Sequence, residues 1–573
     1  MGKDKSLSFL KLILRCFLNK QVILLLLILF VAAVLRLYKI TTDPPGFHRD
    51  EVLFGYNAYS ILKTGMDEHG RFLPLSFEGF GIFDYPLAIY LRVPFIAFFG
   101  LTTFAVRFSV TFYSLITIFL VYKLTEKFFG DKNTALIAAL IATFSSWHFF
   151  MSRAGFAISM YGFLFLLLGT YLLLYGKKRW QNIAGGISLG LTCFSYAAYY
   201  FFLPLFLLTI LIVFFSEIKK DKNIRVGLFI AFLTMVAAFA IFWEPNFKRV
   251  PQAAFYYNDS GTLWAWTDKP VGEILAGGGE YNKLEWFLHN PRWAYIYRAA
   301  TNYFDGYSPT FWFKIGKGME SNVEGFGNLL LYEPILILTG AIYLIWNKSK
   351  VGLFLSTWIV IGPIATTFTQ DIASTRLLHM VAPFIFLQAV GIKCIWDSFM
   401  KLKPRILVFA ALFIICVPII FLNVLYYDAY FRRMPANAGR WWFKGYLDVV
   451  DLVNKYPQKT VYFRGKGDLA YLFILFRDKY DPRLFQKQVK RDISDINFSF
   501  VSSFGRYNFV DEIKQDQLCQ DFNSIYVERL EPGNDSFLFP KDSQLIPDGS
   551  ISSAGSDKFV YFIPTPEKCT KVY

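Results

Sequence analysis

The sequence predicts an α-helical polytopic membrane protein with a C-terminal α/β domain outside the membrane. Hydrophobic residues make up 55% of the 573 residues, and charged residues only 18%, against roughly 25% in soluble proteins. Apolar runs long enough to cross a bilayer recur up to about residue 425. After Tyr426 the hydropathy falls and short alternating segments replace these runs. This composition excludes soluble, disordered and fibrous classes.

The first apolar run, Val22–Tyr38, is interpreted as a span and not as a cleaved signal peptide. Lys39–Asp43 offers no small-residue cleavage site. Pro86–Gly100 is short and carries Arg92, so we assign it to a juxtamembrane helix, with a twelfth span as the alternative. The remaining runs centre near 104–124, 134–150, 157–175, 181–197, 199–216, 224–243, 329–347, 351–369, 376–398 and 404–425. With the first run they predict about eleven transmembrane helices.

Lysine and arginine gather on alternate connections, which places the N-terminus in the cytoplasm and the protein in the inner membrane. The net charge of +16 is explained by these basic connections, so it does not indicate nucleic acid as a partner. The expected parts are a cytoplasmic segment 1–20, a transmembrane domain 21–425 with outer loops 39–103 and 244–328, and an extracytoplasmic α/β domain 426–573. All five histidines then lie on the outer face or at the outer end of a span: His48, His69, His148, His289 and His379.

The C-terminal domain is predicted to alternate helices and short strands. We expect helices at Trp441–Tyr456 and Gly467–Lys479, and strands at Thr460–Phe463, Phe498–Val501, Ser524–Glu528 and Lys558–Ile563. Two of the six cysteines, Cys519 and Cys569, lie in this domain, and an exported compartment would permit them to pair.

The first outer loop contains an acid pair, Asp50-Glu51, directly after a Pro-Pro-Gly-Phe-His-Arg stretch and before an expected helix Val52–Lys63. A carboxylate held at a helix N-terminus can act as a general base on an acceptor hydroxyl. The alternative is structural, with Asp50 as the helix cap and Glu51 as a first-turn acid. A further acid, Asp84, either binds a sugar hydroxyl or caps the juxtamembrane helix.

Cationic side chains at the outer ends of the predicted spans form a candidate phosphate-binding set: Arg107, Arg153, Arg376 and His379. A buried guanidinium needs an anionic partner, and its planar fork suits a lipid phosphate. The alternative is interfacial snorkelling toward headgroups. Aromatic residues of the second outer loop, including Trp264, Trp266, Trp286, Trp293 and Trp312, are candidates for sugar stacking or for interfacial anchoring. No zinc or calcium motif is present in the sequence.

Together these motifs resemble the GT-C membrane glycosyltransferases, in the branch of the protein O-mannosyltransferases and the bacterial lipid A aminoarabinose transferases. The resemblance covers about residues 20–215, and weakly Ser374-x-Arg376. It is carried by Asp50-Glu51, by Asp84-Tyr85-Pro86-Leu87, by Ala105-Val106-Arg107-Phe108 and by Val121-Tyr122-Lys123-Leu124. Relatives often have His or Lys in the second of these motifs, where this chain has Phe83-Asp84-Tyr85-Pro86, which leaves the substrate open.

The resemblance implies inverting transfer of one sugar from a polyprenyl-phosphate carrier to an acceptor hydroxyl on the outer face of the membrane. Asp50 matches the catalytic acid, and the substrate-binding set is Glu51, Asp84 and His148. The donor-phosphate set is Arg107, Arg153, Arg376 and His379. No cofactor is required, and a divalent metal is compatible with the carboxylate pair but not indicated. The implied partners are the lipid-linked donor, membrane lipids, and a protein, glycolipid or polysaccharide acceptor of the cell envelope.

Two other functions stay open at this point. A lipid or polysaccharide flippase or transporter would favour inverted repeats and charges at the bilayer midplane, which the sequence does not show. A polymerase or ligase that uses diphosphate-linked oligosaccharide would favour more cations at the outer face.

Overall fold

The computed structural model describes most of the chain. The described residues are 19–79, 82–244, 268–278, 282–314, 319–369, 372–401, 403, 405–465, 469–493, 499–511, 513, 518–530, 536, 546–552 and 556–569. The predicted cytoplasmic segment therefore lies almost wholly outside the described residues, as do Trp264, Trp266 and Phe498.

The chain divides into two compact units. The helical unit consists of Met1–Arg36, Thr111–Ser152 and Ala157–Tyr426. The mixed unit consists of Leu37–Val110, Arg153–Phe156 and Tyr427–Tyr573. The mixed unit therefore combines the first outer loop with the whole C-terminal domain.

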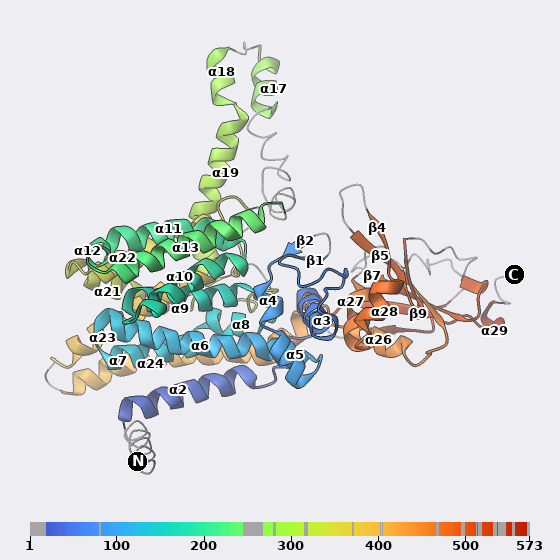
Figure 1. Ribbon diagram of the computed structural model, residues 1–573, viewed down its shortest axis with the longest axis horizontal. Helices are drawn as coiled ribbons and strands as arrows, with labels where there is room; N and C mark the ends of the chain where they lie inside the picture. The colour runs from blue at the N-terminus through green and yellow to red at the C-terminus, as the bar shows by residue number, and fades with distance from the viewer. Residues whose placement is uncertain are drawn as a thin grey trace. The chain divides into compact units, whose positions relative to one another are not determined.

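The helical unit is built from helices, the longest of them apolar, and Figure 1 labels most of these. Their bounds are α2 Lys20–Leu37, α6 Thr103–Phe129 (its first turns belong to the mixed unit), α7 Lys132–Phe144, α8 Ser146–Arg153, α9 Ser159–Tyr175, α10 Arg179–Leu191, α11 Ala198–Val213, α12 Phe215–Lys220, α13 Lys222–Ile241, α17 Asp268–Ala276, α18 Lys283–Leu288, α19 Pro291–Asp305, α20 Pro309–Phe313, α21 Glu333–Trp346, α22 Lys350–Ile361, α23 Val381–Phe399 and α24 Arg405–Asp428.

Among the described residues, five helices are long and apolar enough to cross a membrane, or six if the bent pair α7 and α8 is one span. Shorter apolar helices account for four more of the predicted runs: Ser159–Tyr175, Ala198–Val213, Glu333–Trp346 and Lys350–Ala365. The membrane class is thus supported, while the count of eleven spans is not confirmed. Leu87–Phe99 would extend only about 20 Å as a helix, short of the roughly 30 Å of hydrocarbon, which favours the juxtamembrane assignment.

The outer surfaces of these helices are apolar, as lipid contact requires. Phe30 of α2 is 66% exposed, and Phe409 and Phe413 of α24 are 68% and 69% exposed. Inside the unit, small residues allow close helix packing. A Cβ atom at Gly340 of α21 would collide with a backbone carbonyl of α23, so only glycine permits this approach.

The mixed unit contains a seven-stranded sheet in the order β4-β5-β6-β3-β7-β9-β8. Figure 1 labels four of these strands, β4, β5, β7 and β9. The central strands β6, β3 and β7 are parallel, and the outer strands pair antiparallel. The strands are β3 Thr460–Arg464, β4 Lys490–Ile493, β5 Ser499–Phe504, β6 Tyr507–Val510, β7 Ser524–Leu530, β8 Gly549–Ile551 and β9 Lys558–Phe562. The helices of this region are α25 Met434–Asn437, α26 Tyr446–Val453, α27 Ala470–Arg477, α28 Pro482–Gln488 and α29 Pro566–Cys569.

The first outer loop contributes a helix and a small hairpin to the same unit. The elements are α3 Arg49–Thr64, β1 Phe77–Gly79, β2 Ile82–Asp84, α4 Leu87–Tyr90 and α5 Val93–Phe99. Helix α3 packs against α27, and the ring of Phe47, which precedes α3, lies 4.7 Å from the ring of Phe476 in α27. Helix α27 of the C-terminal domain thereby supports the loop that carries the acid pair.

The C-terminal domain also contains a disulfide bond between Cys519 and Cys569, whose Cα atoms are 5.7 Å apart. Disulfides persist in oxidising compartments and are rare in the cytosol. The external position of the domain stays a prediction.

Candidate functional site

The candidate site begins at the N-terminus of α3. His48 is the N-cap residue and forms a capping box with Glu51, so its ring nitrogen accepts from the backbone N–H of Asp50 at 3.2 Å. The Asp50 side chain is not the cap. It is 34% exposed, and its carboxylate lies 3.8 Å from His48 Nδ1 and 3.6 Å from Arg49 Nε. The structural alternative for Asp50 is therefore wrong, and its carboxylate is accessible on a fixed helix turn.

Glu51 is fully buried and forms an ion pair with Arg107, with Nη2 and Oε2 3.0 Å apart. Its carboxylate also accepts from the backbone N–H of His48 at 2.9 Å and of Gly155 at 2.6 Å. Glu51 thus joins α3 to α6 and to the chain that follows α8. The Glu51 carboxylate accepts four hydrogen bonds and so anchors the first turn of α3.

Arg107 uses all five of its N–H donors inside the protein. The Nε–H and one N–H of Nη2 donate hydrogen bonds to the carboxylate of Glu51. The other three donors reach the carbonyl oxygens of Ile40 at 3.0 Å, Pro44 at 3.0 Å and Gly46 at 2.9 Å. Arg107 has no donor left for a lipid phosphate in this arrangement. The geometry makes it a positioning residue that fixes the Pro-Pro-Gly turn before α3.

Arg153, the last residue of α8, lies fully buried in the same unit. Its Nε donates to the hydroxyl of Tyr430 at 3.0 Å, and its Nη2 donates to the carbonyl of Asp43 at 2.7 Å. Tyr430 and Phe431 both lie 5.2 Å from the guanidinium carbon. These residues belong to a π-helical turn, Ala429–Arg433, that follows α24. Arg153 is thus fixed beside the first outer loop, and its role toward a donor phosphate stays a prediction.

Asp43 is a site residue that the sequence did not reveal. It is 4% exposed, and its Oδ2 has no hydrogen-bond partner among the described residues. Burial raises the pKa of its carboxyl, while Lys39, Arg153 and Arg107 oppose the rise. Only its place before Pro-Pro-Gly distinguishes it in the sequence. A buried carboxylate among three cations helps to set the electrostatics of this loop.

Asp84 ends β2, which pairs antiparallel with β1, and its side chain is half-buried. Helix α4 begins after Pro86, which makes no side-chain cap hydrogen bond. Asp84 is therefore not the cap of this helix, and its predicted contact with a sugar hydroxyl stays a prediction.

His148 belongs to the helical unit and is 1% exposed. Its Nδ1 accepts from Arg36 Nη2 at 3.0 Å, because a guanidinium can only donate. Its Nε2 therefore carries the proton and donates to Thr117 Oγ1 at 2.8 Å. Both ring nitrogens are occupied, so this geometry leaves His148 no group for the substrate contact that we predicted. The ring instead holds Arg36 against the break between α7 and α8, where Arg36 also donates to the carbonyl of Thr143 at 3.1 Å.

Arg376 and His379 also belong to the helical unit. His379 is 1% exposed, with its ring centroid 4.0 Å from that of Phe202 and its Nε2 3.1 Å from the carbonyl oxygen of Gly362. Arg376 is half-buried in the turn before this histidine. Their roles toward a donor phosphate stay predictions. The structure brings Asp50, Glu51, Asp84, Arg107 and Arg153 into one unit.

A comparison with family models finds a similarity in the N-terminal part of the chain. Residues 25–255 match the model of the dolichyl-phosphate-mannose-protein mannosyltransferases. The resemblance to the GT-C membrane glycosyltransferases is confirmed. The matched segment includes Asp50, Glu51, Arg107 and Arg153 and excludes Arg376. No curated protein matches the chain.

Solved structures support the fold. The apo oligosaccharyltransferase of Archaeoglobus fulgidus is similar with a TM-score of 0.50 and 14% identity, over 81% of this chain and 64% of that one. The oligosaccharyltransferase AglB of the same organism, solved with an inhibitory peptide and a dolichol-phosphate, has a TM-score of 0.49 and 15% identity, over 80% of this chain and 64% of that one. The chain thus spans less than two thirds of the length of these structures.

Proposed function

We propose that the protein transfers a single sugar from a polyprenyl-phosphate carrier to an acceptor hydroxyl outside the cytoplasmic membrane. The family match supports this class of donor. The observation that carries the proposal is the contrast within the acid pair, because Glu51 is fully paired while Asp50 presents a part-exposed carboxylate. One residue anchors the helix turn, and its neighbour is available for chemistry.

In the proposed reaction, Asp50 accepts the proton of the acceptor hydroxyl as the hydroxyl oxygen attacks the anomeric carbon. The bond between that carbon and the carrier phosphate breaks on the opposite side, so the configuration inverts. The leaving polyprenyl phosphate takes the bonding electrons, and cations stabilise its growing charge. We assign this task to Arg153, which lies in the same unit as Asp50, and the role of Arg376 stays a prediction. Because no nucleotide diphosphate leaves, the step requires no diphosphate-binding metal, and the proposal includes none.

The proposed orientation puts the N-terminus in the cytoplasm and the mixed unit on the outer side. It is supported by the lysines and arginines of alternate connections and by the Cys519–Cys569 disulfide. Asp50 then works on the face where polyprenyl-linked sugars meet exported acceptors.

Donor class is tested with the purified full-length chain in proteoliposomes. We expect transfer from radiolabelled polyprenyl-phosphate sugars and none from nucleotide sugars. Because the fold is similar to that of an oligosaccharyltransferase, a second candidate function stays open: a ligase that uses diphosphate-linked oligosaccharide. Transfer only from a polyprenyl-diphosphate oligosaccharide would favour that candidate, and transfer only from nucleotide sugars would contradict both.

A further inference from the structure

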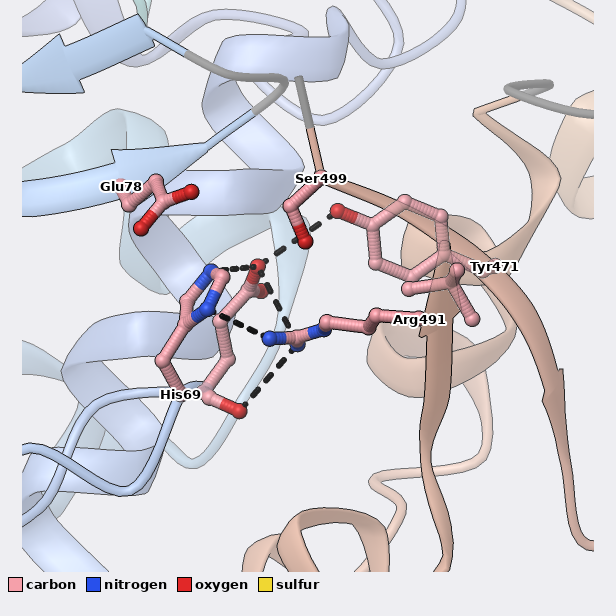
Figure 2. Close-up of a pocket in the computed structure, with 7 residues that line it drawn as sticks. His69, Glu78, Tyr471, Arg491 and Ser499 are labelled. Carbon is pink, nitrogen blue, oxygen red and sulfur yellow. Dashed lines mark hydrogen bonds and ion pairs between the residues drawn. The ribbon is translucent and has the colours of Figure 1, made fainter. Parts of the chain in front are cut away.

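The polar cluster that Figure 2 shows in the mixed unit is closed by its own contacts. Nη1 of Arg491 in β4 lies 2.5 Å from His69 Nδ1, and Nη2 lies 3.9 Å from Glu68 Oε1. The hydroxyl of Tyr471 in α27 lies 3.5 Å from the same carboxylate oxygen. The residues that line this hollow leave no space that a water molecule could enter. The cluster therefore joins the first outer loop to the C-terminal domain and offers no ligand site.

The helical unit, in contrast, carries a segment whose exposed face is apolar. Helices α18 and α19, residues 283–305, form this segment, which we call the apolar arm. Exposed apolar side chains of α19 recur at three- and four-residue intervals: Trp293, Ile296, Ala300 and Phe304. This spacing places them along one face of the helix. Ile296 is 57% exposed and Phe304 is 67% exposed, so the described part of the chain does not cover this stripe.

The other side of α19 faces the protein. Ala294 and Asn302, which lie away from the stripe, are both buried. Nδ2 of Asn302 donates to the carbonyl oxygen of Thr369 at 2.6 Å. The helix therefore uses its inner face for contacts within the helical unit, and its apolar stripe is left for another partner.

Helix α18 extends the exposed apolar surface of the arm. The ring of Phe287 in α18 lies 5.4 Å from the ring of Trp293 in α19. The apolar side chains of α18 are all at least half exposed: Leu284, Trp286, Phe287 and Leu288. Contiguous exposed apolar side chains of this kind mark a contact surface.

The base of the apolar arm is fixed at one end of α22. The hydroxyl of Tyr303 donates to the carbonyl oxygen of Val360 at 2.7 Å, and that of Tyr307 donates to the carbonyl oxygen of Ile359 at 2.9 Å. Helix α22 begins at Lys350, in a connection predicted to be cytoplasmic. In the proposed orientation, its other end therefore lies at the outer face. Val360 is itself 56% exposed, so the apolar surface of the bundle reaches the base of the arm.

The direction of α19 suits a helix that lies on a membrane. Figure 1 shows α19 leaving the bundle across the direction of α6 and α13, two of the helices that are long and apolar enough to span. A helix that runs across the spans lies along the plane of the bilayer. An apolar face with aromatic side chains, in that orientation and at the ends of the spans, is typical of the membrane interface.

The side chains of the stripe disfavour a sugar as its partner. Ile296, Ala300 and Phe304 have no hydrogen-bonding group, whereas a sugar site needs polar groups for the hydroxyls. Sugar stacking is therefore not favoured for Trp293 of this stripe. Trp312 does not belong to the arm, because it is 5% exposed and its ring lies 5.2 Å from that of Trp147.

The charge of the apolar arm also bears on the class of partner. Its cations are Lys283, Arg292 and Arg298, and its acids are Glu285 and Asp305. These charges nearly cancel, so attraction to anionic headgroups contributes little. Removal of the apolar side chains from water is then the main driving force for the contact.

We propose that the apolar arm lies in the headgroup region of the outer leaflet, with the stripe of α19 toward the acyl chains. Its partner is the surface of the lipid bilayer, without preference for anionic lipid. The contact fixes the depth of the second outer loop at the membrane. The leaflet follows from the proposed orientation, while the contact itself does not depend on sugar transfer.

Photo-crosslinking identifies what covers the stripe. Full-length Ile296→p-benzoylphenylalanine and Phe304→p-benzoylphenylalanine are irradiated in isolated native membranes, and the purified protein is analysed by intact-mass spectrometry. We expect both to gain the mass of one phospholipid. Ile493→p-benzoylphenylalanine is the matched control, because Ile493 of β4 is an isoleucine that is 74% exposed on the C-terminal domain. Its phospholipid adduct should be about tenfold less abundant, since a side chain in water does not meet acyl chains.

A second measurement tests the role of charge. The Ile296 variant is irradiated in nanodiscs of phosphatidylcholine alone and of phosphatidylcholine with phosphatidylglycerol, and we expect equal adduct yields. A crosslink to a second copy or to another protein as the main product in native membranes would overturn the inference. Adducts at Ile296 no more abundant than at Ile493, or adducts that require phosphatidylglycerol, would also overturn it. Adding Asp50→Asn should leave the adducts unchanged, so loss of sugar transfer and loss of lipid contact are distinguishable.

Discussion

Arg107 and Glu51 form an ion pair in which neither side chain is exposed to solvent, with Nη2 and Oε2 3.0 Å apart. The pair connects the start of α6 to the first turn of α3, so it fixes the turn from which Asp50 projects. Its role is to hold geometry, since every donor of the guanidinium is used within the protein.

Removal of one partner of this pair should strongly destabilise the protein. Arg107→Met leaves Glu51 as a buried, unpaired carboxylate, and such losses typically cost about 3–5 kcal/mol. The double variant Glu51→Leu with Arg107→Met should regain part of this stability, because no charge then remains buried. Thermal unfolding of the detergent-solubilised protein measures both effects. A single variant as stable as the wild type would show that the pair does not anchor α3.

If Arg376 binds the donor phosphate, Arg376→Ala should weaken donor binding roughly tenfold, since one charge-assisted contact to phosphate is lost. Binding of polyprenyl phosphate to the purified protein measures this. Lys220→Ala, which removes an exposed cation from a connection predicted to be cytoplasmic, is the control. Unchanged affinity in the Arg376 variant would move the phosphate site to other residues.

Asp43→Asn should stabilise the protein at neutral pH. Because burial raises the pKa of Asp43 above 3.8, the folded state binds more protons than the unfolded state between that value and the folded pKa. Wild-type stability therefore falls as the pH rises through this window, and asparagine, which does not ionise, avoids the loss. The stability difference should appear above the window and vanish below pH 3.8. Unfolding at a series of pH values checks this.

Asp448→Asn, which removes an exposed carboxylate from α26, controls for the loss of one negative charge. If the Asp43 variant were less stable than the wild type at neutral pH, its carboxylate would be stabilising its cationic neighbours by more than its burial costs.

Replacement of both Cys519 and Cys569 by serine should destabilise the C-terminal domain. The bond closes a loop with a sequence separation of 50 residues, for which chain entropy gives up to about 4 kcal/mol. Denaturant unfolding, with Cys416→Ser as the control for an exposed free cysteine, measures the loss. Two free thiols in the mass spectrum of the unreduced protein would refute the bond itself.

Much of the architecture could be predicted from the sequence because its signals are local. Apolar runs indicate spans, and alternation indicated β3, β7 and β9 within a few residues. The short strands β4, β6 and β8 and the helix α28 were missed. Each has only three to seven residues, and the strands depend on pairing with distant parts of the chain.

The site could be predicted less completely, because contacts between distant residues decide each role. The acid pair was recognised, but the sequence could not show that Glu51 is buried with Arg107 while Asp50 is exposed. His48 replaced Asp50 as the helix cap, since its ring nitrogen reaches the backbone N–H. The hydrogen bond between Arg36 and His148 depends on the bend between α7 and α8, and no sequence pattern predicted that bend.

The most direct test of the account is sugar transfer by Asp50→Asn, with donor binding measured on the same preparation. The variant keeps the shape of the side chain and the Glu51–Arg107 anchor but cannot accept the proton of the acceptor hydroxyl. We predict that it binds polyprenyl-phosphate sugar like the wild type and transfers none of it. Transfer at the wild-type rate would contradict the assignment of Asp50 as the base.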